Sequence, residues 1–188
     1  MRQLINHVAG TLTLIIGSLT AVAMVFSPAI IFIFAPGFHD DAVRFDLAAD
    51  MLRITFPYLL LISLTAFAGG ILNSYGRFGA SSFTPVLLNL TMIACAIWLA
   101  PLLTTPIMAL AWGVLIAGIV QLGFQWLPLR QINLVPRFKP NFKDPDVKRI
   151  LTLMLPAMFG VSVSQINLLL DTILASFLVA GSVSWLYT

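Results

Sequence analysis

The stretch from Arg53 to Asn89 constrains this chain more than any other. It runs through about twenty apolar and small residues from Ile54 to Ser74, then through the polar break Tyr75-Gly76-Arg77, and then into a second apolar run. A hydrocarbon layer roughly 30 Å thick needs about 20 helical residues at 1.5 Å each. The stretch therefore predicts a helix that crosses a membrane, a tight turn, and a second helix that returns.

The composition of the whole chain supports a membrane location. Of its 188 residues, 60% are hydrophobic and 9% are charged, whereas soluble domains carry about 25% charged residues. Glutamate is absent, and the lysines, arginines and aspartates gather between apolar runs. We therefore expect an all-α, polytopic transmembrane helix bundle. The basic residues flank apolar runs and no nucleic-acid recognition motif accompanies them, so we expect no nucleic-acid partner.

The apolar runs predict about five full crossings and the start of a sixth. Pro28 should kink the first of them, because a proline inside a helix removes one backbone hydrogen bond. Thr105-Pro106 and Asp144-Pro145 have the residue types of a helix cap followed by a first helical residue. The expected crossings are 8–34, 47–74, 82–100 and 106–129, then a long helix from 145 to about 180, with 181–188 opening the next helix.

The charges predict the orientation of these crossings. Six of the ten lysines and arginines lie between Arg130 and Arg149. With five crossings, the Arg2 end, the Arg77 turn and this polar segment share one side, which the positive-inside rule makes cytoplasmic. The sequence thus predicts a basic cytoplasmic loop at 131–144 between the helices of 1–130 and those of 145–188. The loop around His39 and the link 101–106 then face outward.

Asp171 is the acidic residue that lies within an apolar run. Asn167 and Ser164 precede it by four and seven residues, which puts all three on one face of a helix. A charge in a membrane helix costs about 2.5–3.5 kcal/mol on insertion scales and usually points into a bundle or an aqueous cavity. Three interpretations stay open: a site for a cation or proton, a neutral hydrogen-bonded carboxyl with a structural role, and a solvated residue of an outer vestibule.

Several polar residues inside the apolar runs are candidates for lining a cavity. Gln165 lies on a second polar face of the Asp171 helix, and Asn89 lies in the middle of the third crossing. An unpaired amide in hydrocarbon costs several kcal/mol, so Asn89 must face protein or water, as helix contact or as cavity lining. The cavity-lining candidates are Asn89, Ser164, Gln165 and Asn167.

Small residues mark one stripe of the second crossing. Ser63, Ala66, Gly70 and Asn73 recur at spacings of three and four. This pattern favours close helix packing, with a substrate-lining role as the alternative. In the fourth crossing Gln121 and Gln125 lie one turn apart.

The chain offers little for catalysis. Its two histidines, His7 and His39, lie near a helix start and in a loop, where we expect solvated interface residues rather than ligands. There is no HExxH motif, no paired intramembrane carboxylates and no phosphate-binding loop. We therefore expect no catalytic residues, no metal site, no cofactor and no enzyme.

Two stretches resemble a known family. They are ITFPYLLLISLTAFAGGILNSYGRFGASSFTPVLLN at 54–89 and PAMFGVSVSQINLLLDTILASFLVAGSVSW at 156–185. Both closely resemble the MurJ/MviN lipid II flippases of the multidrug/oligosaccharidyl-lipid/polysaccharide exporter superfamily, and the similarity is colinear over essentially the whole chain. Members have about fourteen helices, with two six-helix lobes that rock around a cationic cavity.

The resemblance implies a function and a set of partners. Such a protein moves lipid II or a related undecaprenyl-linked precursor of peptidoglycan from the inner to the outer leaflet of the bacterial cytoplasmic (inner) membrane by alternating access. Its partners would be that substrate, membrane lipid and the remaining helices of its own full-length chain. A coupling cation, Na⁺ or H⁺, is possible in the superfamily, in line with the ion-site interpretation of Asp171.

The same alignment makes this chain a piece of such a protein, truncated at both ends. Its first four crossings resemble the third to sixth helices of the first lobe, and its fifth resembles the first helix of the second. The family's cavity arginines fall outside these residues, and Arg53 and Arg77 do not replace them. The alternatives are a drug or polysaccharide exporter of the same superfamily and a non-transporting membrane scaffold.

Overall fold

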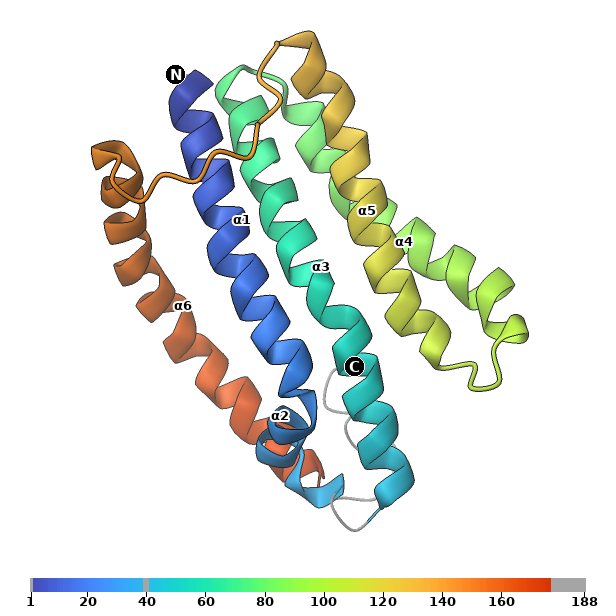
Figure 1. The fold of residues 1–188 in the computed structure, drawn as a ribbon. Coiled ribbons are helices and arrows are strands. Elements are labelled where there is room, and N and C mark those ends of the chain that lie inside the picture. The colour runs from blue at the N-terminus through green and yellow to red at the C-terminus, as the bar shows by residue number, and fades with distance from the viewer. Residues whose placement is uncertain (1, 39–40, 177–188) are drawn as a thin grey trace.

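The structure, a computed structural model, describes residues 2–38 and 41–176. Within these residues every regular element is helical, as predicted (Figure 1). His39 and the predicted opening of a sixth crossing at 181–188 lie outside the described residues. The elements are α1 (Arg2–Val25), α2 (Ser27–Phe34), η1 (Pro36–Phe38), α3 (Ala42–Ser74), α4 (Phe78–Ala94), η2 (Cys95–Leu99), η3 (Ala100–Leu102), α5 (Met108–Gln131) and α6 (Pro145–Ser176).

Four stretches of helix are long and apolar enough to cross a membrane. They are Arg2–Val25, Ala42–Ser74, Phe78–Leu102 and Met108–Gln131, and each overlaps a predicted crossing. The prediction of a polytopic helical bundle is thereby confirmed. α6 has 32 residues and runs from one end of the bundle to the other (Figure 1). It is not among these four spans, and the fifth crossing stays a prediction.

The first apolar run is broken near Pro28, as predicted. α1 ends at Val25 and α2 begins at Ser27. Pro28 has no N–H to donate to the carbonyl of Met24, four residues before it. The Arg53 side chain of α3 donates its Nε–H to that carbonyl instead, at 3.4 Å. An interhelical contact thus fills the gap that the proline leaves in the backbone hydrogen bonds.

Helix starts follow the predicted cap chemistry in some places and not in others. α3 begins at Ala42 rather than near 47, and the carboxylate of Asp41 accepts from Arg44 N at 3.1 Å. α6 begins at Pro145 after Asp144, as predicted, and Asp144 Oδ1 accepts from the Asp146 amide at 2.9 Å.

The predicted cap at Thr105 is wrong. α5 begins at Met108, after Ile107, with no side-chain cap. The Thr105 backbone carbonyl accepts from Met108 N at 3.0 Å, so a tight turn leads into the helix. This turn satisfies the backbone without using the threonine hydroxyl.

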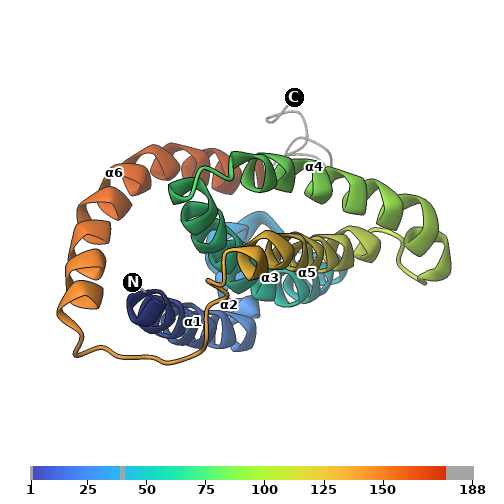
Figure 2. The same ribbon diagram turned by 90° about the horizontal axis from the view of Figure 1, so that it is seen from above.

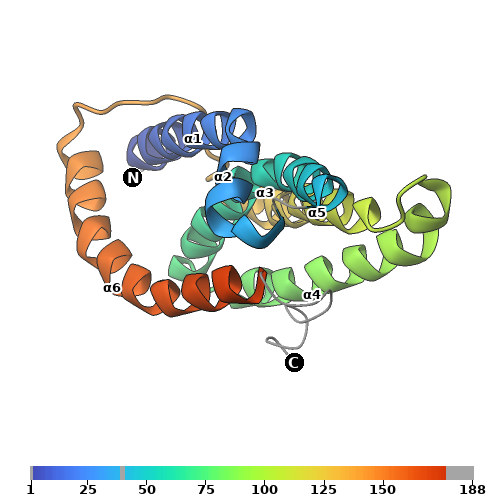
Figure 3. The ribbon, with the colours of Figure 1, turned by 90° about the horizontal axis from the view of Figure 1, so that it is seen from below.

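Helix α3 is the centre of the described bundle. It contacts α1, α2, α4 and α5, while α6 contacts only α1, α2 and η1 among the described elements. Seen along the bundle, α1, α3 and α5 lie next to one another, α4 covers one side and α6 curves away from beside α1 (Figures 2 and 3). A cluster of buried apolar residues joins α1, α3 and α5: Ile5, Ala68, Ile71, Leu72, Leu129 and Leu134.

The basic segments lie at one end of this bundle. The start of α1, the turn between α3 and α4 and the segment that follows α5 are together at the end opposite α2 and the α4–α5 link (Figure 1). Arg77 of that turn donates to the Gln131 side chain at the end of α5. This arrangement is the one that the orientation argument requires, and the side of the membrane itself stays a prediction.

Candidate functional site

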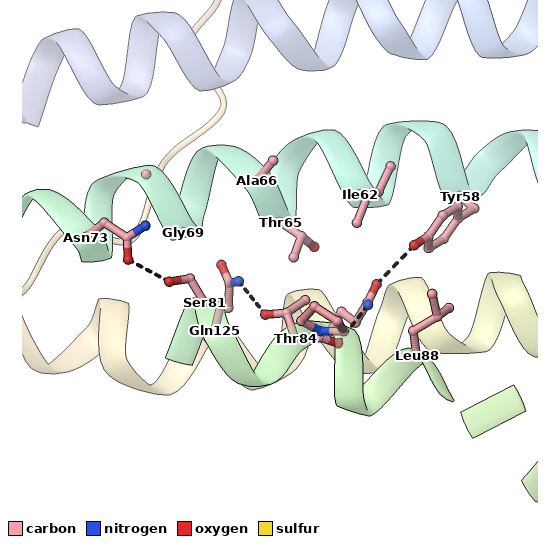
Figure 4. A pocket seen from close by; sticks show the side chains of 13 residues that line it. Tyr58, Ile62, Thr65, Ala66, Gly69, Asn73, Ser81, Thr84, Leu88 and Gln125 are labelled. Atoms are coloured by element: carbon pink, nitrogen blue, oxygen red, sulfur yellow. Dashed lines mark hydrogen bonds between the residues drawn. The ribbon is translucent and has the colours of Figure 1, made fainter. Parts of the chain in front are cut away.

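The candidate site is a pocket of about 420 Å³ between α3, α4 and α5 (Figure 4). Seven of its thirteen lining residues carry a hydroxyl or amide side chain, and none of these described residues is charged. The polar ones are Tyr58, Thr65, Asn73, Ser81, Thr84, Gln121 and Gln125. Hydroxyl and amide side chains thus gather where these three helices meet.

Two amides of α5 hold the α4 side of the pocket. Gln121 and Gln125 are each 1% exposed. Gln121 Nε2 donates to the Thr84 carbonyl at 3.0 Å, and Gln125 Nε2 donates to Thr84 Oγ1 at 2.9 Å. Thr84 Oγ1 in turn donates to the Ala80 carbonyl at 3.1 Å. Both amides therefore fix α4 against α5 at Thr84.

Two further contacts tie α3 to its neighbours at the two ends of the pocket. Tyr58 of α3 donates its hydroxyl to Gln121 Oε1 at 3.5 Å. Ser81 of α4 donates to Asn73 Oδ1 of α3 at 2.6 Å. Figure 4 shows these hydrogen bonds along the length of the pocket. Polar side chains in a membrane bundle contribute to helix association when they are paired in this way.

Small residues of α3 make room for the pocket. A Cβ built on Gly69 would lie 3.2 Å from Ser81 Cβ and 3.6 Å from Gln125 Nε2, whereas a Cβ built on Gly70 meets no atom within 4 Å. The predicted packing stripe through Ala66, Gly70 and Asn73 lines the pocket instead. Among the described residues, Gly69 rather than Gly70 makes the close helix contact.

The predicted site residues lie elsewhere. Asn89 is exposed on α4, and Gln165 and Asp171 are exposed on α6. The side chains of Ser164 and Asn167 lie outside what the structure describes. The described side chains of Asn89, Gln165 and Asp171 do not line the α3–α4–α5 pocket. Their roles as ion site and cavity lining stay predictions.

A second cluster of contacts joins the start of α1 to the segment before α6. His7 Nδ1 and Asp144 Oδ2 are 2.7 Å apart, and both side chains are about four-fifths buried, with 23% and 19% exposed. The expectation that His7 is merely solvated is wrong, because the start of α6 folds back onto α1. The hydrogen bond from His7 is the main cause that holds the pKa of Asp144 below its ordinary value of 3.8.

Backbone groups of the same segment also dock on α1. Asn6 Oδ1 accepts from Arg137 N at 2.8 Å, and Thr11 Oγ1 accepts from Asn141 N at 3.2 Å. A Cβ on Gly10 would lie 2.5 Å from Pro140 N. Together with the His7–Asp144 pair, these contacts make a strap, residues 137–144, across the first turns of α1.

The pocket amides are functional candidates that the sequence argument passed over. Gln121 and Gln125 lie one turn apart in the fourth apolar run, and their partner Thr84 lies near the start of the preceding one. The available signal was the rule that an amide in hydrocarbon needs a partner. The same rule holds for Asn89, but Asn89 is exposed on α4 whereas both glutamines are buried.

No group of three or more metal-binding side chains occurs among residues 2–38 and 41–176. The pocket offers amides and hydroxyls but no carboxylate, thiol or imidazole. Such a lining suits hydrogen bonding rather than proton transfer between strong acids and bases.

Comparisons with known proteins agree along the whole chain. A sequence model of a family, described as Lipid II flippase MurJ, matches residues 1–188. A "Probable lipid II flippase MurJ" of Haemophilus influenzae is 47% identical over 99% of this chain and 38% of its own length. The protein of the same name from Vibrio cholerae is 47% identical over 99% of the chain and 37% of its own length. A "Lipid II flippase MurJ" of Burkholderia cenocepacia is 40% identical over 98% of the chain and 37% of its own length.

The chain thus spans well under half of the length of these curated relatives. The matches nevertheless cover almost every residue that it has, including all four candidate spans. This chain belongs to the lipid II flippase MurJ family.

Proposed function

We propose that the complete protein moves lipid II from the inner to the outer leaflet of the bacterial inner membrane by alternating access. The observation that carries this proposal is the family match over residues 1–188, joined to four helices that are long and apolar enough to cross a membrane. The relatives named above supply the substrate class. On this proposal the described helices are part of the wall of the transport path.

The two docked regions suit that role in different ways. The strap at 137–144 holds the start of α6 to α1, so these two helices move together at that end of the bundle. The pocket amides hold α4 to α5 through Thr84. Rigid groups of helices are what a rocking motion of two lobes requires, because such motions turn whole packed bodies about a few hinge positions.

Depletion of the protein in its bacterium tests the proposed substrate. We expect lipid-linked peptidoglycan precursor to accumulate in the inner leaflet, followed by loss of cell shape and lysis. A drug or polysaccharide exporter of the same superfamily would leave precursor handling unchanged after depletion. That outcome would contradict the flippase proposal and favour the exporter.

We further propose that Asp171 takes part in coupling to Na⁺ or H⁺. The support is its charge on a largely apolar helix, where an acidic side chain is costly unless it serves a site. Asn167, Ser164 and Gln165 of the same helix are the proposed neighbours.

The test is Asp171→Asn in the complete protein, with Asp146→Asn at the start of α6 as the matched control. We expect Asp171→Asn to abolish the dependence of transport on the cation gradient and Asp146→Asn to leave it intact. Unaltered gradient dependence in Asp171→Asn would remove Asp171 from the coupling mechanism.

A further inference from the structure

The α3–α4–α5 pocket contains buried polar atoms that the helices themselves leave unpaired. Four buried side-chain polar atoms of the described residues have no hydrogen-bond partner, and two of them, Thr65 Oγ1 and Gln125 Oε1, belong to residues that line this pocket. Thr65 is 2% exposed and Gln125 is 1% exposed. A buried polar atom without a partner is destabilising, so two such atoms on one pocket indicate a missing partner.

The Thr65 hydroxyl lacks the backbone hydrogen bond that other hydroxyls in these helices make. The hydroxyls of Thr13, Ser63 and Thr84 each donate to the carbonyl four residues earlier, at 2.7 to 3.1 Å. Such back-bonding is the usual way to satisfy a hydroxyl in a membrane helix. The Thr65 hydroxyl makes no such bond.

The two unpaired atoms lie close to the same turn of α3. Gln125 Oε1 is 3.8 Å from the position that a Cβ on Gly69 would take. Thr65 precedes Gly69 by four residues and so lies one turn away on the same face of α3. Figure 4 shows Gln125 beside this turn, with its Nε2 engaged by Thr84 and its Oε1 left toward α3. Both unpaired atoms therefore belong to residues that line the same pocket.

The lining chemistry selects the class of molecule. Gln125 Oε1 only accepts hydrogen bonds, while a threonine hydroxyl donates or accepts. An anion would be repelled by the lone pairs of Gln125 Oε1. A cation would find no acidic side chain to balance its charge among the thirteen described lining residues. A neutral O–H donor meets both requirements. The volume of about 420 Å³ also exceeds the roughly 30 Å³ that each water occupies in the liquid.

We propose that this pocket is a binding site for neutral hydroxyl groups, in which the bound O–H donates to Gln125 Oε1 and its oxygen accepts from the Thr65 hydroxyl. Water is one source of that hydroxyl and a sugar head group is the other. In either case the first part of the chain carries a hydrated, uncharged site within its membrane helices, separate from Asp171.

Two preparations of the complete protein test the site and separate the sources. One uses a maltoside detergent and the other an amine-oxide detergent without sugar. The structure of the protein is determined in each at a resolution that shows ordered water. Density within hydrogen-bond distance of both atoms in both preparations identifies water, and density only in the maltoside preparation identifies a sugar hydroxyl. An empty pocket in both preparations overturns the proposal.

Thr65→Val gives an independent readout, because it removes the hydroxyl at nearly constant volume. We expect the melting temperature of the complete protein to fall by about 2 °C or more, and Thr65→Ser to preserve it. Thr20→Val is the matched control, since Thr20 Oγ1 of α1 is also buried and unpaired but Thr20 does not line this pocket. An unchanged or raised melting temperature in Thr65→Val, or an equal fall in Thr20→Val, would contradict a bound partner at Thr65.

Discussion

At the scale of single residues, Gly118 of α5 allows the close approach of α3. A Cβ on Gly118 would lie 2.8 Å from Tyr58 Cδ2 and 3.0 Å from Leu61 Cβ. Real Cβ atoms essentially never adopt the first distance and rarely adopt the second, and Leu61 Cβ is fixed to its backbone. The same tyrosine donates to Gln121 in the pocket. Gly118 therefore supports the pocket by bringing α3 and α5 together.

Gly118→Ala should destabilise the complete protein by about 1–3 kcal/mol, because the added methyl group overpacks the α3–α5 contact. Gly123→Ala on the same helix is the matched control, since its added Cβ meets no atom within 4 Å. The control should be neutral or stabilising by up to about 1 kcal/mol, as alanine favours a helix. Chemical unfolding in detergent measures both, and equal effects would contradict the described packing.

Asp144→Asn should reveal a pH-dependent contribution of the His7–Asp144 pair. The pKa of Asp144 is lowered in the folded protein, so ionised Asp144 stabilises the fold above its ordinary pKa and this contribution is lost as the pH falls through the lowered value. Asparagine keeps an oxygen that can cap α6 but carries no charge.

Melting curves of the unchanged protein and of Asp144→Asn test this between neutral pH and pH 3. The unchanged protein should have the higher melting temperature near neutral pH. The difference in melting temperature between the two proteins should disappear once the pH drops below 3.8 toward the lowered pKa. A melting-temperature difference that stays constant down to pH 3 would show that the charge of Asp144 contributes nothing to stability.

At the scale of elements, the strap 137–144 is held by backbone as well as by side chains. Its amides at Arg137 and Asn141 donate to Asn6 and Thr11 of α1. Its backbone at Lys139 and Pro140 lies so close to Gly10 that no side chain fits between them. The connection between α5 and α6 is therefore a docked segment rather than a free loop.

Gly10→Ala tests the docking of this strap. The added Cβ would fall 2.5–2.7 Å from the backbone of Lys139 and Pro140, which cannot move aside as a side-chain end can. We expect a loss of about 1–3 kcal/mol in stability and faster protease cleavage within 137–144. Gly17→Ala on the same helix meets only Leu60 Cδ2 at 3.9 Å and should leave cleavage unchanged; equal cleavage in both variants would contradict the close approach.

The sequence predicted the four long apolar helices because membrane thickness sets the length of such helices. Helix ends were less predictable: Asp144 caps α6, but Thr105 does not cap α5. The pocket was not predicted, since it depends on which faces of α3, α4 and α5 meet. Gln121, Gln125 and Thr84 become a cluster only when those helices pack. A lone charge such as Asp171 is visible in the sequence, whereas a shared neutral site is not.

At the scale of the whole molecule, the described helices form a bundle with its basic segments gathered at one end. The strap and the α3–α4 turn share that end, while the α4–α5 link lies at the other. If the positive-inside rule holds, the strap is cytoplasmic. Both ends carry exposed residues, including Lys139 and Thr104, that can be replaced by cysteine.

Cysteine labelling of the complete protein in a Cys95→Ala background tests this orientation. Thr104→Cys should react with a membrane-impermeant thiol reagent in intact cells with a permeable outer membrane. Lys139→Cys should react only after the inner membrane is opened. Labelling of both positions from the same side would contradict the single crossing between them.

The central claim, that the complete protein carries lipid II across the membrane, is tested most directly in vesicles. The complete protein is reconstituted into liposomes that contain fluorescent lipid II, and an impermeant reagent reports the fraction of substrate that becomes accessible on the outside with time. The account predicts exposure well above that of protein-free liposomes and no acceleration for a phospholipid of similar chain length. Equal exposure of lipid II with and without the protein would contradict it.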